Sequence, residues 1–262
     1  MLDILSSIHV KKCDLKTLQK YIYEYYVKNN IIVDSFWEDH VRVSNFYKIE
    51  DGENIVGFFA IYKETVLVLF HVFEKYRKIS QELFFLIKKF ESVNQALIPT
   101  GDEFFISHAI DNYTRIEKQA YFSIYTDENP KKILDIELQL ADLDKDRETL
   151  NLCYDFLKEE LENRESAINE EIYTVKHKNN IIGFGIIEYQ KIIDIYASTG
   201  MTVRDEYRQS GYGASILYRM RNIVKEKGLI PISGCWYYNH NSKKTMESAG
   251  AYSKSRLLRF HF

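Results

Sequence analysis

The stretch Arg208-Gln209-Ser210-Gly211-Tyr212-Gly213 joins a β-branched, strand-like run that ends at Val203 to an amphipathic helix predicted to begin near Ala214. Two glycines separated by one residue allow a tight turn that presents backbone N–H groups outward. The N-terminus of the following helix adds a partial positive charge, so an anion is favoured at this point. The stretch therefore predicts a cradle for a phosphate or pyrophosphate group.

The helix prediction rests on apolar residues that recur at helical spacing with charged residues between them, namely Ile216, Leu217, Met220, Ile223 and Val224. Gly228 follows the last charged turn and suits the position just after a helix. A new apolar run starts at Leu229 and is predicted to be a strand. The expected order is strand, glycine turn, helix and strand.

This order carries a family resemblance. Val203 followed by residues 207–213 resembles the acyl-CoA-binding motif of the GCN5-related N-acetyltransferases (GNAT), whose signature is Arg or Gln, two residues, Gly, one residue, and Gly or Ala. Downstream, Asn239, Ser242 and the pair Ala249-Gly250 resemble the closing pattern of the same family. The resemblance covers roughly residues 135–262 and implies an α/β (α+β) fold with a mixed, mostly antiparallel central sheet flanked by helices.

The resemblance also implies acetyl-CoA as the acyl donor and gives it a place on this chain. The strand end at residues 201–203 would hydrogen-bond the pantetheine arm, Asn239 would face that arm, and the N–H groups of residues 209–214 would hold the pyrophosphate. The expected donor-binding residues are Met201, Thr202, Val203, Arg208, Gln209, Ser210, Gly211, Tyr212, Gly213, Ala214, Asn239 and Ser242.

At the position of the residue that would protonate the leaving thiolate, this chain differs from the family pattern. Many members carry a tyrosine seven residues after the asparagine, whereas this chain has Met246, which has no proton to donate. Among the nearby tyrosines, Tyr252 is the first candidate for a substitute. His240 is a second catalytic candidate, because a histidine beside Asn239 could titrate near neutral pH.

The sequence also offers only indirect candidates for the general base. Family members often carry a carboxylate upstream of the valine, but here the residues are Ser198, Thr199 and Gly200. Asp194 and Glu188 lie further back on neighbouring strands, and either would act through ordered water. The alternative for both is an ordinary solvated position on a strand.

An internal repeat indicates two tandem GNAT-like domains. Residues 54–61, Asn-Ile-Val-Gly-Phe-Phe-Ala-Ile, resemble residues 180–187, Asn-Ile-Ile-Gly-Phe-Gly-Ile-Ile. A repeat of this length corresponds to a whole folding unit. The polar segment 126–132 contains a proline and is the natural linker. We therefore expect one domain at 1–130 and a second, with the acyl-CoA motif, at 131–262.

The first half lacks the cradle, since Ser80 and Glu82 stand where the second half has Gly211 and Gly213. Side chains at these positions would block the backbone, and a carboxylate would repel a pyrophosphate. This degenerate domain is interpreted as a wall of the substrate site, as a dimer platform, or as a decayed duplicate. A homodimer is thus left open.

The amino-acid composition narrows the classes of partner that are expected. The chain has 262 residues, of which 45% are hydrophobic and 28% charged, with a formal net charge of -3. We expect no nucleic-acid partner, because there is no positive surplus. No apolar run approaches a membrane span, so no membrane association and a cytoplasmic location are expected. Cys13, Cys153 and Cys235 are widely spaced, which argues against a disulfide framework or a metal site.

The function predicted from these observations is N-acyl transfer, in which the amine of a small molecule or peptide attacks acetyl-CoA directly in a ternary complex. The missing tyrosine and carboxylate leave room for an alternative, a non-catalytic acyl-CoA-binding sensor or interaction module. A third possibility is an acyltransferase that uses a longer acyl group or an acyl donor other than CoA. The identity of the amine is not specified by the sequence.

Overall fold

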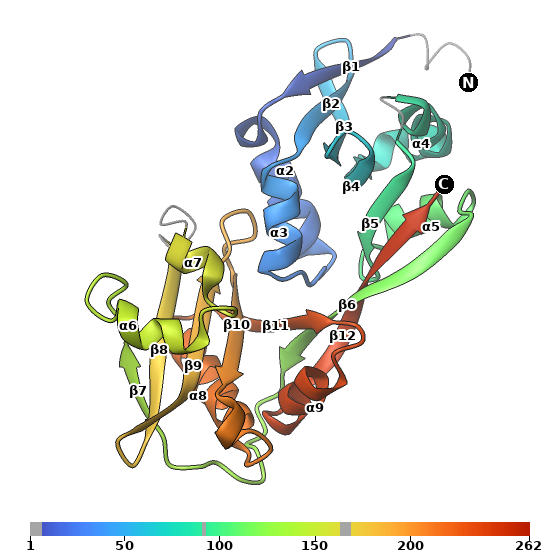
Figure 1. Cartoon of the computed structure of the whole chain (residues 1–262). Coiled ribbons are helices and arrows are strands. Elements are labelled where there is room, and N and C mark those ends of the chain that lie inside the picture. Colours follow the sequence, from blue (N-terminus) through green and yellow to red (C-terminus); the bar gives the residue numbers. More distant parts are fainter. Residues whose placement is uncertain (1–6, 91–92, 163–168) are drawn as a thin grey trace. The chain divides into compact units, whose positions relative to one another are not determined.

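The computed structural model describes residues 7–90, 93–162 and 169–262 (Figure 1). By packing, the chain divides into two compact units. The first unit contains Met1–Ala120 and Ser255–Phe262, and the second contains Tyr121–Lys254. Each has a mixed sheet with helices packed on it. None of the helices in the described part of the chain is long and apolar enough to cross a membrane.

The first unit is built around strands β1 to β5. Its elements in chain order are β1 (Ile8–Cys13), α2 (Leu15–Lys28), α3 (Ser35–Arg42), β2 (Asn45–Asp51), β3 (Asn54–Tyr62), β4 (Val66–Val72), the 3-10 helix η1 (Glu74–Ile79), α4 (Ser80–Lys89), β5 (Gln95–Pro99), α5 (Glu103–Ile110) and β6 (Arg115–Tyr125). Strands β1 to β4 pair antiparallel, and β4 pairs parallel with β5.

The second unit repeats this plan. Its elements are β7 (Glu137–Leu140), α6 (Arg147–Leu150), the 3-10 helix η3 (Asn151–Cys153), α7 (Lys158–Glu162), β8 (Glu170–His177), β9 (Asn180–Tyr189), β10 (Tyr196–Val203), the 3-10 helix η5 (Asp205–Tyr207), α8 (Tyr212–Glu226), β11 (Ile230–Trp236), α9 (His240–Ser248) and β12 (Ala251–His261). Strands β7 to β10 pair antiparallel, and β10 pairs parallel with β11. The expected mixed, mostly antiparallel sheets are present.

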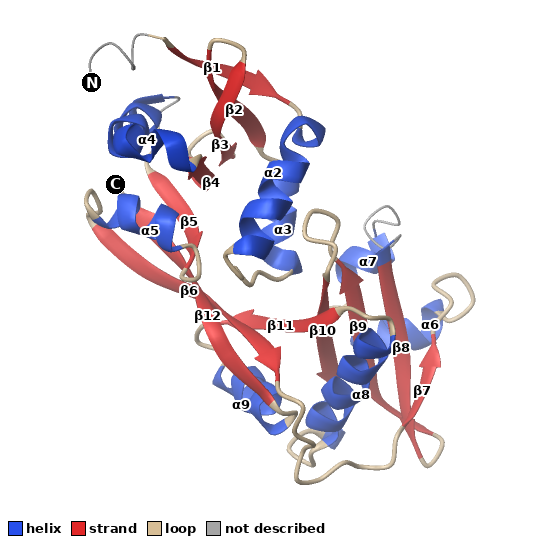
Figure 2. Cartoon of the chain, turned by 180° about the vertical axis from the view of Figure 1, so that it is seen from behind, coloured by secondary structure: helices blue, strands red, loops and turns tan. Residues whose placement is uncertain are grey.

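Two long strands belong to both units. β6 lies in the first unit up to Ala120 and in the second from Tyr121, while β12 lies in the second unit up to Lys254 and in the first from Ser255. They are neighbours in the strand order β5-β12-β6-β11, and Figure 2 shows them side by side. The division at residue 130 stays a prediction about the duplicated halves, since the folded units share these strands.

The sheet of the second unit is covered on both faces. Helix α8 packs Ile216, Met220 and Val224 onto one face, which we call the α8 face, against Val175, Ile187 and Val203. Leu150, Leu157 and Leu161, from the segment containing α6 and α7, pack on the opposite face against Ile172, Phe184 and Ile186. We call this the acceptor-side face. Apolar residues on both faces explain the continuous apolar run of β9.

The helix expected near Ala214 is confirmed, although it begins two residues earlier, at Tyr212. Its predicted apolar residues face the sheet or lie beside it. Gly228 follows the helix with φ +76°, a left-handed conformation that glycine adopts at no steric cost. The strand after it begins at Ile230.

Candidate active site

Strands β10 and β11 pair over a short stretch and then separate. Their parallel register runs from Tyr196 opposite Ile230 to Ser198 opposite Ile232. Beyond that point β10 continues to Val203 with only β9 beside it in register. The backbone of residues 199–203 on the β11 side is therefore left without a strand partner, so an extended ligand could pair with it.

Three buried hydroxyl groups mark the point of separation. The Ser233 hydroxyl oxygen lies 2.7 Å from that of Thr199 and 2.7 Å from that of Tyr125, and the Tyr125 and Thr199 oxygens are 3.1 Å apart. Ser233 also donates to the Thr199 carbonyl oxygen at 2.9 Å. Burial raises the pKa of Tyr125, so its hydroxyl stays protonated. The cluster ties β6, β10 and β11 together where the opening begins.

The predicted cradle lies between β10 and α8. Gln209 and Gly211 have φ values of +60° and +92°, and Gly211 is the N-cap residue of α8 with no side chain to cap the helix. The first backbone bond of the helix runs from Ser215 N to Gly211 O at 3.2 Å. The N–H groups of residues 212–214 precede it, so they have no intrahelical acceptor. These groups and the helix dipole favour an anion.

The turn is held in place by its neighbours. Arg208 donates from Nε to the Val203 carbonyl oxygen at 3.0 Å and forms an ion pair of 2.8 Å with Asp205. The fully buried Ser215 hydroxyl donates to Gly211 O at 3.2 Å. Arg208 therefore fixes the entry to the turn, and Ser215 fixes its exit.

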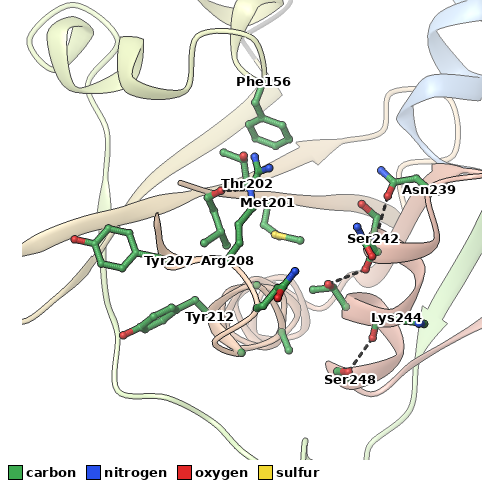
Figure 3. Close-up of a pocket in the computed structure, with 17 residues that line it drawn as sticks. Phe156, Met201, Thr202, Tyr207, Arg208, Tyr212, Asn239, Ser242, Lys244 and Ser248 are labelled. Atoms are coloured by element: carbon green, nitrogen blue, oxygen red, sulfur yellow. Dashed lines mark hydrogen bonds between the residues drawn. The ribbon is translucent and has the colours of Figure 1, made fainter. Parts of the chain in front are cut away.

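A cavity of about 750 Å³ extends from this turn along the end of β10 (Figure 3). Pockets for small molecules and cofactors have volumes of ~300–1,000 Å³. Of the twelve donor-binding residues expected from the sequence, all but Ser210 line it. The lining consists of Phe156, Met201, Thr202, Val203, Tyr207, Arg208, Gln209, Gly211, Tyr212, Gly213, Ala214, Asn239, Asn241, Ser242, Lys244, Thr245 and Ser248.

Six of these residues were not expected from the sequence. Tyr207 lies at the cradle, and Asn241, Lys244, Thr245 and Ser248 recur at helical spacing on α9, which is a signal that the sequence offered. Phe156 comes from the segment before α7, far away in the chain. The described lining residues include Lys244 and Arg208, of which Arg208 is ion-paired with Asp205, and no carboxylate, and this balance of charge suits an anionic ligand.

Asn239 caps a helix and also lines the cavity. It is the N-cap of α9, where its Oδ1 accepts from the N–H of Ser242 at 3.0 Å. Its side-chain amide nitrogen remains as a donor. Figure 3 shows Asn239 and Ser242 on the α9 side of the cavity, across from Met201 and Thr202.

The two catalytic candidates lie outside the lining of the cavity. His240 is the first residue of α9, and its backbone N–H donates to Tyr238 O at 3.0 Å. Tyr252 lies on β12 with 48% of its surface exposed. Met246, at the position of the missing tyrosine, is buried between α8, α9 and neighbouring strands. The hydroxyl in the cavity nearest in sequence to Asn239 is that of Ser242.

Of the two carboxylates considered as bases, Glu188 lies on the sheet beside β10. It is directly opposite Ser198, while Ile186 is opposite Gly200 and Phe184 is opposite Thr202. Because alternate residues share a face, Glu188 lies on the acceptor-side face with Ile186 and Phe184. Asp194 is exposed between β9 and β10 and is not part of the cavity lining.

No cluster of metal ligands accompanies the cavity. Within the described residues, no group of three or more His, Cys, Asp or Glu side chains could hold a metal ion. Cys13, Cys153 and Cys235 are half-buried and form no disulfide within the described part of the chain, and burial raises the pKa of the Cys153 thiol.

Comparison with known proteins gives a family-model match and several similar structures. A family model described as an acetyltransferase (GNAT) domain matches residues 14–126, within the first half. An acetyltransferase of the GNAT family from Colwellia psychrerythraea has a similar structure, with a TM-score of 0.82 and 19% identity over 97% of this chain and 99% of that chain. Residues 14–126 thus match the GNAT acetyltransferase family, and the fold of the whole chain is similar to that of GNAT proteins. No curated protein matches the sequence.

Two other solved structures extend the similarity over both units. A GCN5-related N-acetyltransferase from Sphaerobacter thermophilus has a TM-score of 0.63 and 10% identity, covering 98% of this chain and 95% of that one. A tandem GNAT protein from the clavulanic acid biosynthesis pathway has a TM-score of 0.59 and 10% identity, covering 97% of each chain. The fold is thus a tandem GNAT fold.

The first GNAT unit has a closed counterpart of the site. Asp102 caps α5 by accepting from Phe105 N at 3.0 Å, as Asn239 caps α9. Two and three residues after the cap, the second unit has Asn241 and Ser242 in the cavity. The first unit has Phe104 and Phe105 at these positions, and both pack against the ring of Phe70.

The cradle of the first GNAT unit is also filled. The buried Ser80 hydroxyl lies 2.8 Å from the Arg77 carbonyl oxygen and 2.7 Å from Nε2 of His108. The N-cap of α4 is Ile79, whose φ of -114° is ordinary. The prediction that side chains replace the glycines is consistent with this packing, and the aromatic filling adds a reason that the sequence comparison had missed.

Proposed function

We propose that this protein transfers an acetyl group from acetyl-CoA to a primary amine in a ternary complex, with the second unit as the catalytic unit. The observation that carries the proposal is the 750 Å³ cavity, which joins an uncapped helix N-terminus to an unpaired strand edge. The first feature suits a pyrophosphate and the second an amide-containing arm. Acetyl-CoA combines both groups.

Different residues of the chain would bind different parts of acetyl-CoA. N–H groups of residues 212–214 would bind the pyrophosphate, and the β10 backbone from Met201 to Val203 would pair with the pantetheine amides. The Asn239 amide nitrogen would donate to the arm from the other side. The acetyl end would then lie toward Phe156, because Figure 3 shows Phe156 at the end of the cavity opposite Tyr207 and Tyr212.

Amide formation requires a free amine lone pair. The amine nitrogen attacks the thioester carbonyl carbon, a C–N bond forms, the C–S bond breaks, and the amine loses one proton while the thiolate gains one. The ammonium form of the acceptor must lose a proton before it can attack, and we assign this proton to Glu188 through ordered water, because this carboxylate lies on the acceptor-side face beside β10. The thiolate would take its proton from solvent, either directly or relayed through the Ser242 hydroxyl, with Tyr252 and His240 remaining predictions.

The alternative proposal is a non-catalytic acyl-CoA sensor. It is favoured by Met246, which is buried where many relatives carry the proton-donating tyrosine. Such a protein would bind acetyl-CoA without releasing thiol. A longer acyl chain or another donor would use the same cavity.

Calorimetric titration with acetyl-CoA and free CoA, followed by thiol release with a panel of amines, tests the proposal. Micromolar binding of both ligands and amine-dependent thiol release are expected. Binding of acetyl-CoA without thiol release in the presence of any amine would support the non-catalytic sensor. Absence of binding by the folded protein would overturn both readings.

A further inference from the structure

The acyl end of the cavity reaches the acceptor-side face of the second unit. Gly200 has no side chain on that face, and a β-carbon there would lie 2.8 Å from Ile186 and 3.7 Å from the ring of Phe156. Thr202 shares the face because it is two residues further along β10. Phe156 and Thr202 both line the cavity. An acceptor amine that meets the thioester from this face therefore passes Phe156.

Trp236 also projects from the acceptor-side face. Its neighbour Cys235 packs on the α8 face with Leu217 and Met246. Successive side chains of a strand alternate between faces, so Trp236 points the other way. It ends β11, on the side of the opening across from β10, and its carbonyl oxygen accepts from Asn239 N at 2.9 Å. Trp236 thus stands beside the cavity on its acceptor side.

A third aromatic residue has the same orientation. Ala251 is buried on the α8 face, so Tyr252, the next residue of β12, points to the acceptor-side face. Phe156, Trp236 and Tyr252 are 36%, 62% and 48% exposed. Large exposed aromatic side chains that share one face are a feature of ligand-binding surfaces.

Carboxylates lie on the same face. Glu188 is opposite Ser198 on one side and opposite Glu170 of β8 on the other. Glu170 therefore shares the acceptor-side face with Glu188. Two neighbouring carboxylates attract an ammonium group, and exposed aromatic rings bind apolar and aromatic groups and hold cations over their faces.

Building on the proposed function, we propose that the acceptor is a primary amine attached to an aromatic body, and that Trp236 is its specificity-determining residue. The ring of the substrate packs against Trp236 and Phe156 while its ammonium group approaches Glu188. Trp236 is absent from the lining of the donor cavity, so it acts on the acceptor and leaves CoA binding unchanged.

The chain offers a direct optical test that needs no turnover. It contains two tryptophans, and Trp37 is buried with 1% exposure whereas Trp236 is 62% exposed. With CoA bound, titration with 2-phenylethylamine is expected to shift the emission of Trp236 to shorter wavelength and to protect it from acrylamide. Ethanolamine is the matched polar amine and is expected to do neither. In W236F, which keeps a ring at this position, the emission response to 2-phenylethylamine disappears.

The kinetic test compares the same two amines as acetyl acceptors. We expect kcat/KM for 2-phenylethylamine to exceed that for ethanolamine at least tenfold. W236A should lower kcat/KM for 2-phenylethylamine about tenfold through KM, because the ring of the substrate loses an apolar surface against which it is buried. The dissociation constant for CoA stays unchanged. The control is F85A, because Phe85 is 48% exposed on α4 of the first unit.

The outcomes separate this inference from the proposed function. Turnover that prefers ethanolamine, or that W236A leaves unchanged, would overturn the aromatic acceptor and leave acetyl transfer standing. An unchanged KM together with a change in oligomeric state in W236A would make Trp236 a contact between copies of the chain and would also overturn it. Absence of CoA binding would overturn both.

Discussion

Gly213 and Thr245 pack against each other so closely that a β-carbon at residue 213 would lie 2.9 Å from Cγ2 of Thr245. The same β-carbon would lie 3.2 Å from Sδ and Cε of Met201. Glycine at this position therefore lets α8 approach both α9 and β10. The second glycine of the motif serves packing, whereas Gly211 serves the turn through its φ of +92°.

We expect G213A to destabilise the protein by about 1–3 kcal/mol, because the added methyl group overpacks this contact. It should also weaken binding of CoA, since Met201 and Thr245 both line the cavity. Urea unfolding and calorimetry measure the two effects. G101A is the control, because its β-carbon would meet no atom closer than 3.7 Å. Equal stability of G213A and G101A would contradict the packing role.

The charge of the cavity gives a second prediction. The described lining residues include no carboxylate, and N241D introduces one there with almost no change in the size of the side chain. Repulsion of the pyrophosphate should weaken CoA binding about tenfold at low salt and less at high salt. N54D makes the same charge change at an exposed position of the first unit and should have no effect. An unchanged dissociation constant in N241D would place the phosphates elsewhere.

The hydroxyl cluster gives a third prediction. In Y125F, Thr199 and Ser233 keep their mutual contact of 2.7 Å, so the loss in stability should be about 0.5–1.5 kcal/mol. S233A removes the hydroxyl that contacts both of the others and also donates to Thr199 O, so it should cost more. Thermal unfolding of the two variants compares them. A larger loss in Y125F would mean that Ser233 is not the centre of the cluster.

A buried carboxyl group in the first unit makes stability depend on pH. Burial raises the pKa of Asp102 from 3.8 to about 7, and the Tyr25 hydroxyl donates to it. Between these two pH values the folded protein holds a proton that the unfolded chain releases. The free energy of unfolding therefore falls as pH rises through this window, by at most about 1.4 kcal/mol per pH unit for one group.

D102N should remove this contribution, because the amide oxygen can still accept from Phe105 N but does not titrate. Burial raises the pKa of Asp34 to about 7, so that residue adds a slope of the same sign in both proteins. Burial lowers the pKa of His71 to about 3, which makes the free energy of unfolding rise with pH up to 6.5. Urea unfolding from pH 4 to 8 tests the difference. Parallel curves for the two proteins would show that Asp102 does not titrate in this window.

The sequence predicted the local structure around the proposed cradle, because that structure depends on nearby residues. Residues 203–228 form a strand end, a turn with left-handed glycine, a helix and a closing glycine, and each depends on neighbours a few residues away. Eleven of the expected donor-binding residues line one cavity for the same reason, because most of them belong to this one stretch. The helical register also placed Ile216 and Met220 on the sheet.

The tertiary structure alone decided the rest. Phe156 reaches the cavity from a segment far away in the chain, and β10 and β11 separate at a point fixed by hydroxyl groups from three strands. Phe104 and Phe105 close the equivalent site of the first unit, and β6 and β12 pass from one unit to the other. Local spacing sets the conformation of a short segment. Which distant side chains fill or line a site depends on the packing of elements that only the folded chain brings together.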